Sequence, residues 1–203
     1  MVRKRGNSSS RETNPFRLSP GVLAFQALTA SRFFLAIVFA VILLSADWST
    51  RILWTCFIIL VIAELTDLLD GMLARRFGIT SEFGAMLDPY IDSMTRLLVF
   101  WSLATAGLVL DFVPIVMALR DVTVAHLRII LIHRGRSVGA KWSGKIKAQA
   151  QTAGSLLAML GAIYSQSLGT WMIPVISWVV VVVTVGSIVE YARAAFLSAR
   201  ARR

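Results

Sequence analysis

The chain has 203 residues and a formal net charge of +10, and 57% of its residues are hydrophobic. This length predicts one domain, or at most two. Only 16% of the residues are charged, well below the roughly 25% of soluble domains, and the apolar residues gather in long runs. These features exclude an ordinary soluble protein and indicate a polytopic membrane protein.

Six apolar segments follow a polar, basic tail at residues 1–19. Each is long enough to cross a hydrocarbon core of about 30 Å as a helix. Their expected limits are 22–45, 52–75, 83–108, 112–133, 144–165 and 169–196. The prediction is therefore an all-α fold, with a six-helix membrane domain over 20–197 and a basic tail over 198–203. The first segment has no small-residue cleavage site and is interpreted as a retained span.

Connections that carry lysine or arginine alternate along the chain with connections that carry few or none. These basic residues occur in the N-terminal tail, after the second and fourth segments and at the C-terminus, whereas the connections after the third and fifth segments have none. By the positive-inside rule, both termini and the second connection face the cytoplasm. This pattern predicts an integral protein of the bacterial inner or plasma membrane. It indicates contact with anionic lipid and no nucleic-acid partner.

Four aspartates stand out within the stretch DLLDGMLARRFGITSEFGAMLDPYID, residues 67–92. Asp67 and Asp70 are three apart and Asp88 and Asp92 are four apart, so each pair shares one helical face. The short connection between them predicts an antiparallel hairpin whose four carboxylates converge in the cytoplasmic half of the bundle.

Such a cluster needs compensating charge. One ionised aspartate inside a membrane costs roughly 2.5–3.5 kcal/mol, and converging carboxylates also repel one another. One or two divalent cations solve this problem, and hard carboxylate oxygens suit Mg²⁺ or Mn²⁺. Small neighbours, Gly71, Ala74 and Gly84, leave room for a bulky ligand, and Arg75 is suited to bind phosphate.

This pattern resembles the signature of the CDP-alcohol phosphatidyltransferases at every position and spacing. Its residues, in order, are Asp67, Asp70, Gly71, Ala74, Arg75, Gly84, Asp88 and Asp92. The resemblance implies a six-helix membrane enzyme, usually a homodimer, with a site open to the cytoplasm. It implies that the four aspartates hold two divalent ions, which bind the pyrophosphate of a CDP-linked lipid such as CDP-diacylglycerol.

The same resemblance implies the other roles. Residues Gly71, Ala74 and Gly84 make space for the nucleotide. Arg75 contacts phosphate, and the metal ligand Asp67 also belongs to the binding site of the CDP-linked lipid. The last aspartate, Asp92, is implied as the general base that takes a proton from the acceptor hydroxyl, which attacks the lipid-bearing phosphoryl group and expels CMP.

Basic residues elsewhere suggest an acceptor that carries a phosphate. The candidates are Thr29, Arg32, Arg120, Arg128, Lys145 and Lys147. The stretches that contain them resemble the bacterial subgroup that makes phosphatidylglycerophosphate, with departures at Phe25-Gln26 and Ala148. Glycerol 3-phosphate is therefore the expected acceptor, with inositol phosphate, inositol or serine as alternatives.

Several other interpretations remain open at this point. Arg120 and Arg128 are also explained as helix-end anchors or as partners of Asp121. Lys145 and Lys147 are also explained as ordinary loop charges. Arg32 is also explained as a side chain that reaches the membrane interface. The role of Glu64 is undecided.

A divalent-cation transporter is the alternative function from another class, although carboxylates confined to one hairpin favour an enzyme. A catalytically silent relative that serves as a membrane scaffold is a third possibility.

Overall fold

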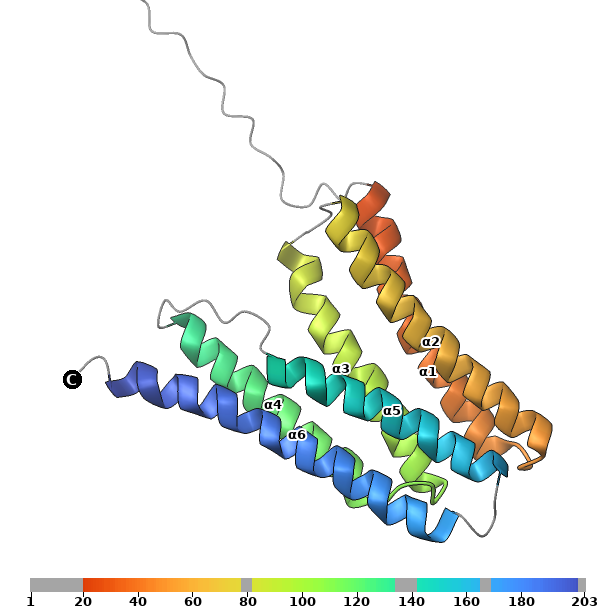
Figure 1. Cartoon of the computed structure of the whole chain (residues 1–203). Helices are drawn as coiled ribbons and strands as arrows, with labels where there is room; N and C mark the ends of the chain where they lie inside the picture. Colours follow the sequence, from red (N-terminus) through yellow and green to blue (C-terminus); the bar gives the residue numbers. More distant parts are fainter. Residues whose placement is uncertain (1–19, 78–81, 134–141, 165–168, 201–203) are drawn as a thin grey trace, which may run out of the picture.

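The computed structural model describes residues 20–77, 82–133, 142–164 and 169–200, with side chains for 30–66, 89–132, 142–164, 171–189 and 191–193. In this part of the chain the secondary structure is six α-helices and no strand (Figure 1). The helices are α1 (Pro20–Ser45), α2 (Thr50–Phe77), α3 (Glu82–Thr105), α4 (Phe112–His133), α5 (Trp142–Tyr164) and α6 (Gly169–Arg200). The all-α prediction is confirmed, and each predicted segment corresponds to one helix.

The helix ends follow from local sequence. Ser49 precedes α2 and its hydroxyl accepts a hydrogen bond from the Ile52 amide at 3.4 Å, which is an N-cap. Helix α3 ends three residues before the predicted limit because Gly107, with φ of +70°, closes a Schellman motif. There the Gly107 amide donates to the Ala104 carbonyl and the Leu108 amide to the Leu103 carbonyl, each at 2.8 Å.

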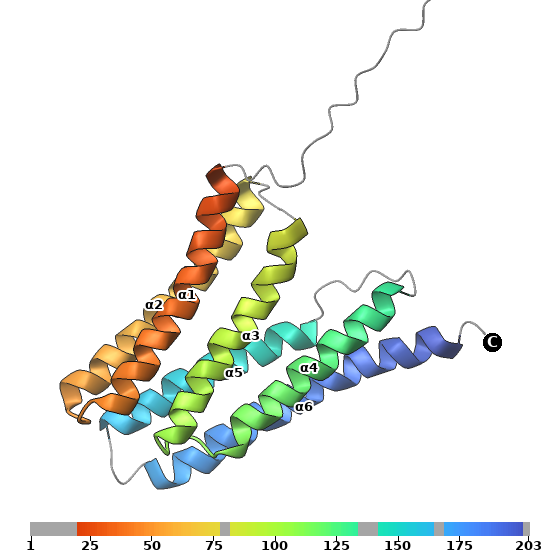
Figure 2. The same ribbon diagram turned by 180° about the vertical axis from the view of Figure 1, so that it is seen from behind.

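The helices alternate in direction, so the starts of α1, α3 and α5 and the ends of α2, α4 and α6 lie toward the same end of the bundle (Figure 1). Seen from behind, the α1–α2 pair and the α4–α6 pair diverge toward this end (Figure 2). The same end carries the predicted aspartate hairpin. The alternation agrees with the pattern of basic connections in the sequence.

Helices α2 and α3 differ from the simple hairpin that their short connection predicts. Among the described residues they run antiparallel without packing on each other, whereas α1 and α5 each pack against both. In the described part of the bundle, α1 and α5 therefore bridge the two aspartate-bearing helices. The sequence gives no direct sign of this, because helix pairing depends on which apolar faces match in three dimensions.

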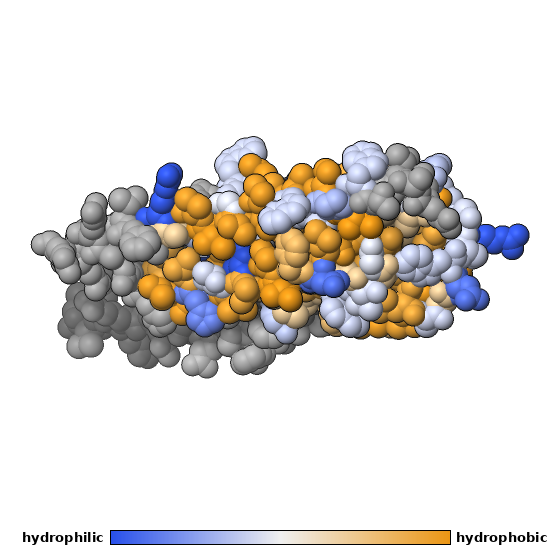
Figure 3. Space-filling view, turned by 90° about the horizontal axis from the view of Figure 1, so that it is seen from below, coloured by the Kyte–Doolittle hydropathy of each residue, from blue (hydrophilic) through white to orange (hydrophobic). Residues whose placement is uncertain are grey.

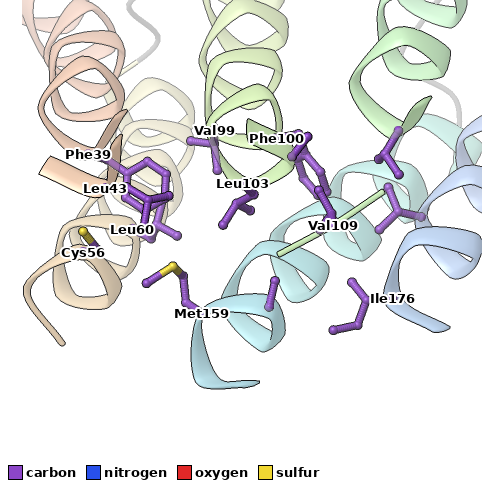
Figure 4. Close-up of a cluster of buried hydrophobic side chains, with 14 of the residues drawn as sticks. Phe39, Leu43, Cys56, Leu60, Val99, Phe100, Leu103, Val109, Met159 and Ile176 are labelled. Carbon is purple, nitrogen blue, oxygen red and sulfur yellow. The ribbon is translucent and has the colours of Figure 1, made fainter. Parts of the chain in front are cut away.

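The core lies where the six helices approach one another (Figure 4). Its buried residues recur every three or four positions along each helix, as one helical face requires. They include Phe39 and Leu43 on α1, Cys56 and Leu60 on α2, Phe100 and Leu103 on α3, Met117 on α4, Met159 on α5 and Val180 on α6. The thiol of Cys56 is free and fully buried in this core.

Helices α5 and α6 approach each other closely at Gly154 on α5. A Cβ placed there would lie 2.7 Å from Cγ2 of Val180 and 3.5 Å from Cγ2 of Ile176, both on α6. Atoms at 2.7 Å overlap, and a valine on a helix has little rotamer freedom with which to move away. The absence of a side chain at Gly154 therefore sets the distance between α5 and α6.

The outer surface is strongly apolar. Large apolar side chains on all six helices are more than a third exposed, among them Phe34, Leu119 and Val182 at 65% each, and they cover much of the face in Figure 3. Within the described residues, Trp171–Arg193 is the one helical stretch that is long and apolar enough to cross a membrane, with a mean hydropathy of 2.4. Ala30–Ser45 is a shorter apolar helix.

Candidate functional site

The eight residues of the aspartate signature all lie on the two helices predicted for them. Helix α2 carries Asp67, Asp70, Gly71, Ala74 and Arg75, and α3 carries Gly84, Asp88 and Asp92. The shared helical faces inferred from their spacing therefore exist in the backbone. Apart from Asp92, the side chains of this set lie outside the described residues, as does the side chain of Thr29 on α1.

The Asp92 carboxylate forms an ion pair with an arginine of α1. Nη1 of Arg32 lies 2.9 Å from Oδ1 of Asp92, and Arg32 is only 7% exposed. The alternative interpretation of Arg32 as a side chain that reaches the membrane interface is therefore wrong. The pair brings a buried cation from α1 to the residue that the sequence suggests as the general base.

A second charged cluster surrounds Asp121 on α4. Its Oδ1 lies 2.7 Å from Nζ of Lys147 on α5 and 3.0 Å from Nη1 of Arg120, its neighbour in sequence. Ser93 on α3, the residue after Asp92, lies near the same carboxylate. Through Ser93, the Asp121 cluster lies beside the Asp92–Arg32 pair.

Lys147 is 7% exposed, so its interpretation as an ordinary loop charge is wrong. Lys145 behaves differently, because it is exposed and its ammonium lies 5.6 Å from the centre of the Trp142 ring. Arg128 lies two turns after Asp121, and its Nε is buried and has no hydrogen-bond partner in the described part of the protein. Of the predicted basic residues, Arg32, Arg120 and Lys147 therefore gather within the bundle.

Helix α6 contributes polar residues that sequence reasoning missed. Nε of Arg120 donates to Oγ of Ser187 at 2.8 Å, and the guanidinium carbon of Arg120 lies 5.9 Å from the centre of the Tyr191 ring. Nε2 of Gln151 on α5 donates to Oγ1 of Thr184 at 3.2 Å. The spacing of Thr184, Ser187 and Tyr191 is that of one helical face. This polar face within a valine-rich segment is the sequence signal that could have revealed them.

The cluster is suited to an anionic ligand. Lys147 and Arg120 share a single oxygen of Asp121, so their combined positive charge exceeds the charge of the one carboxylate between them. Guanidinium and ammonium groups in a low-dielectric setting bind phosphate oxygens strongly. Arg96 adds a further cation on α3, held by the Ala148 carbonyl of α5 at 3.1 Å.

The fit of a metal depends on the chemistry of the four aspartates. Among the residues whose side chains are described, no group of three His, Cys, Asp or Glu residues comes together. Only one of the four predicted ligands, Asp92, belongs to that part of the chain. As a donor set, four carboxylates spaced along two helices match the oxygen ligands that Mg²⁺ and Mn²⁺ prefer.

The helical architecture, the aspartate signature and the buried cations beside it define a class of membrane-associated protein. The sequence profile of the CDP-alcohol phosphatidyltransferases matches residues 23–197, and the chain belongs to this family. Two of its relatives are CDP-diacylglycerol–glycerol-3-phosphate 3-phosphatidyltransferases. The protein of Bacillus subtilis is 33% identical over 66% of this chain and 69% of its own length. That of Yersinia enterocolitica is 37% identical over 52% of this chain and 59% of its own.

A third relative is the "Probable phosphatidylglycerophosphate synthase" of Mycobacterium tuberculosis, which is 36% identical over 44% of this chain and 42% of its own length. The match thus spans less than half of the Mycobacterium protein and somewhat more than half of the Yersinia protein. The resemblance inferred from the signature is confirmed at the level of the family.

Proposed function

We propose that this protein is a phospholipid-synthesis enzyme that transfers a phosphatidyl group from CDP-diacylglycerol to glycerol 3-phosphate and releases CMP. Family membership supports the reaction class. One structural observation supports the acceptor: the Asp92–Arg32 pair and the Asp121–Lys147–Arg120 cluster meet at the adjacent residues Asp92 and Ser93 of α3. A proposed base and a group of phosphate-binding cations thereby occupy neighbouring positions.

Asp92 is proposed to accept the proton of the acceptor hydroxyl as that oxygen attacks the phosphorus of the lipid-bearing phosphoryl group. The new bond forms between the acceptor oxygen and phosphorus, and the bond from phosphorus to the CMP oxygen breaks. A free aspartate is a weak base for an alcohol, so orientation of the hydroxyl must contribute much of the activation. Arg32 holds the Asp92 carboxylate from α1 and thereby limits its rotation.

Asp67, Asp70, Asp88 and Asp92 are the proposed ligands of two Mg²⁺ or Mn²⁺ ions. Such ions supply charge neutralisation at the pyrophosphate and the leaving CMP. The nucleotide is proposed to lie against Gly71, Ala74 and Gly84, whose small size admits it, with Arg75 on a phosphate. These assignments rest on the signature and on the donor chemistry of the carboxylates.

The acceptor phosphate is proposed to bind Arg120 on α4 and Lys147 on α5. The further candidates are Arg128 on α4, Arg32 and Thr29 on α1, and Lys145 on α5. An acceptor without phosphate, such as serine or inositol, would leave the buried cations with less compensating charge. Glycerol 3-phosphate is favoured over inositol phosphate because the relatives in Bacillus subtilis and Yersinia enterocolitica are named for glycerol 3-phosphate.

The six helices are proposed to span the bacterial inner membrane with both termini in the cytoplasm, and the protein is proposed to act as a homodimer among membrane lipids. The apolar outer surface and the alternation of connections with and without basic residues support this arrangement. It places the aspartate signature where soluble acceptor and CMP exchange with the cytoplasm.

An acceptor panel tests the proposal. Purified protein in detergent micelles with CDP-diacylglycerol and Mg²⁺ should release CMP with glycerol 3-phosphate, and little with inositol phosphate, inositol or serine. CMP release only with inositol phosphate, inositol or serine would change the acceptor and keep the reaction class. No CMP release with any of the four would overturn the reaction class and reopen the transporter alternative, which transport of divalent cations into vesicles would then test.

A further inference from the structure

Tyr191 on α6 is a buried aromatic residue, 2% exposed, to which the proposed reaction gives no role. The guanidinium of Arg120 on α4 lies over the face of its ring, with Cζ 5.9 Å from the ring centre. The Tyr191 hydroxyl lies beside the first turn of α5, because a Cβ placed on Gly144 would be 3.9 Å from its oxygen. One side chain of α6 therefore reaches both helices that carry the proposed acceptor cations.

Helices α4 and α5 carry Arg120 and Lys147, and among the described residues these two helices do not pack on each other. Each of them packs on α6. The Asp121 side chain joins the two cations, but the helix that both backbones contact is α6. The position of Arg120 relative to Lys147 therefore depends on how α6 holds α4 and α5.

One face of α6 binds side chains from both of these helices. Oγ of Ser187 accepts a hydrogen bond from Nε of Arg120 at 2.8 Å. Oγ1 of Thr184 accepts one from Nε2 of Gln151 on α5 at 3.2 Å. Tyr191 follows Ser187 by four residues, so its ring belongs to the same face.

The contacts of Arg120 leave one edge of its guanidinium for a ligand. Nε donates to Ser187, Nη1 donates to Asp121 at 3.0 Å, and Tyr191 covers one face of the plane. Neither hydrogen bond uses Nη2, and Nη2 is not among the buried polar atoms without a partner in the described part of the chain. Because the guanidinium is a rigid plane, fixing two nitrogens and one face also fixes the direction in which Nη2 donates.

We propose that Tyr191 is a positioning residue for the acceptor phosphate. Its ring holds the guanidinium of Arg120 so that Nη2 and the ammonium of Lys147 donate to the same phosphate group. A cation over an aromatic face is attracted by the ring, most strongly where water is excluded, and a guanidinium binds phosphate in a defined direction. Tyr191 acts through Arg120, and the inference rests on the proposed function for the identity of the anion.

The separate KM values of the two substrates test this role. Tyr191→Leu removes the ring and should raise the KM for glycerol 3-phosphate about tenfold, the effect expected of a desolvated cation–π contact. The KM for CDP-diacylglycerol and kcat should stay nearly constant. Tyr191→Phe keeps the ring and removes only the hydroxyl, so it should retain a low KM for glycerol 3-phosphate. An equal rise in both variants would overturn the assignment to the ring.

Phe112→Leu is the matched control, because it removes a different aromatic contact between the same two helices. The Phe112 ring at the start of α4 lies 5.4 Å from the Trp178 ring of α6, measured between ring centres. Its loss should lower the midpoint of thermal unfolding and leave both KM values nearly unchanged. If Phe112→Leu raises the KM for glycerol 3-phosphate as much as Tyr191→Leu does, general loosening of α4 against α6 explains the effect, and the positioning role is overturned.

A double-substitution cycle shows whether Tyr191 acts through Arg120. In an Arg120→Met background, Tyr191→Leu should raise the KM for glycerol 3-phosphate no further, because the group that the ring positions is gone. Additive increases would contradict the proposal. If Tyr191→Leu fails to fold, Tyr191→Met serves the same comparison, since methionine fills irregular space without an aromatic face.

Binding of inorganic phosphate separates this inference from the proposed reaction. Phosphate should raise the midpoint of thermal unfolding of the unsubstituted protein and of Tyr191→Phe in detergent, and should raise that of Tyr191→Leu less. If this pattern appears without any CMP release, the proposed reaction fails and the positioning role stands. If CMP is released but Tyr191→Leu changes neither the KM for glycerol 3-phosphate nor the effect of phosphate, the reaction stands and the positioning role is overturned.

Discussion

Nζ of Lys147 on α5 lies 2.7 Å from Oδ1 of Asp121 on α4, and both side chains are largely buried. Since Arg120 binds the same oxygen, one carboxylate compensates two cations. This arrangement stabilises the folded protein only while Asp121 is present, and it leaves the cations with binding capacity for a further anion. Structural and ligand-binding roles thus belong to the same three residues.

Asp121→Asn should lower the free energy of unfolding by about 3–5 kcal/mol, because it leaves two buried cations without their counter-ion. Thermal unfolding in detergent measures the change. The double variant Asp121→Asn/Lys147→Met removes one of the two cations and should be more stable than Asp121→Asn alone. If the double variant is the less stable of the two, the charge argument is incorrect.

Ser187→Ala should raise the KM for glycerol 3-phosphate about tenfold while the KM for CDP-diacylglycerol stays nearly constant. The Ser187 hydroxyl fixes the Arg120 guanidinium at 2.8 Å, and a hydrogen bond to a charged group contributes roughly 1.5–3 kcal/mol. Ser102→Ala is the matched control, since this buried hydroxyl bonds the Leu98 carbonyl of its own helix. Equal changes in both KM values would indicate a general structural effect and not a role in holding the acceptor.

Asp92→Asn should reduce kcat by roughly 10²–10⁴-fold, the range expected when a general base is lost. Release of CMP under saturating substrates measures it. Asp111→Asn, an exposed aspartate in the connection between α3 and α4, should leave kcat unchanged. Full turnover of Asp92→Asn would remove Asp92 from its proposed role as the base.

Chelation of divalent ions should abolish CMP release, and addition of Mg²⁺ or Mn²⁺ should restore it, because the clustered carboxylates and the pyrophosphate would otherwise repel each other. Sodium chloride at matched ionic strength is the control and should restore nothing. Unchanged turnover after exhaustive chelation would contradict the assignment of Asp67, Asp70, Asp88 and Asp92 as metal ligands.

Gly154→Ala should destabilise the protein by about 1–3 kcal/mol, because its Cβ would overlap Val180 at 2.7 Å and force α5 and α6 apart. Gly186→Ala on α6 is the matched control, since a Cβ there meets nothing within 4 Å. It should be neutral or stabilising by up to about 1 kcal/mol, as expected for alanine in a helix. A larger loss at Gly186 than at Gly154 would show that the α5–α6 contact is less tight than described.

Much of this protein could be predicted before its structure was known. Long apolar runs indicate helices because a backbone in lipid must satisfy its own hydrogen bonds, and all six predicted segments are helices. The aspartate signature could be recognised because a ligand set on two helices imposes an exact spacing in the sequence. These are local constraints, and a linear sequence records local constraints directly.

The partners of the buried charges were decided only by the tertiary structure. Arg32 pairs with Asp92 across α1 and α3, Lys147 with Asp121 across α4 and α5, and Ser187 holds Arg120 from 67 residues away. Nothing in the spacing of these residues specifies such pairs, because they depend on which helices pack together and at what rotation. For the same reason, the packing of α1 and α5 against both α2 and α3 could be seen only once the helices were placed in space.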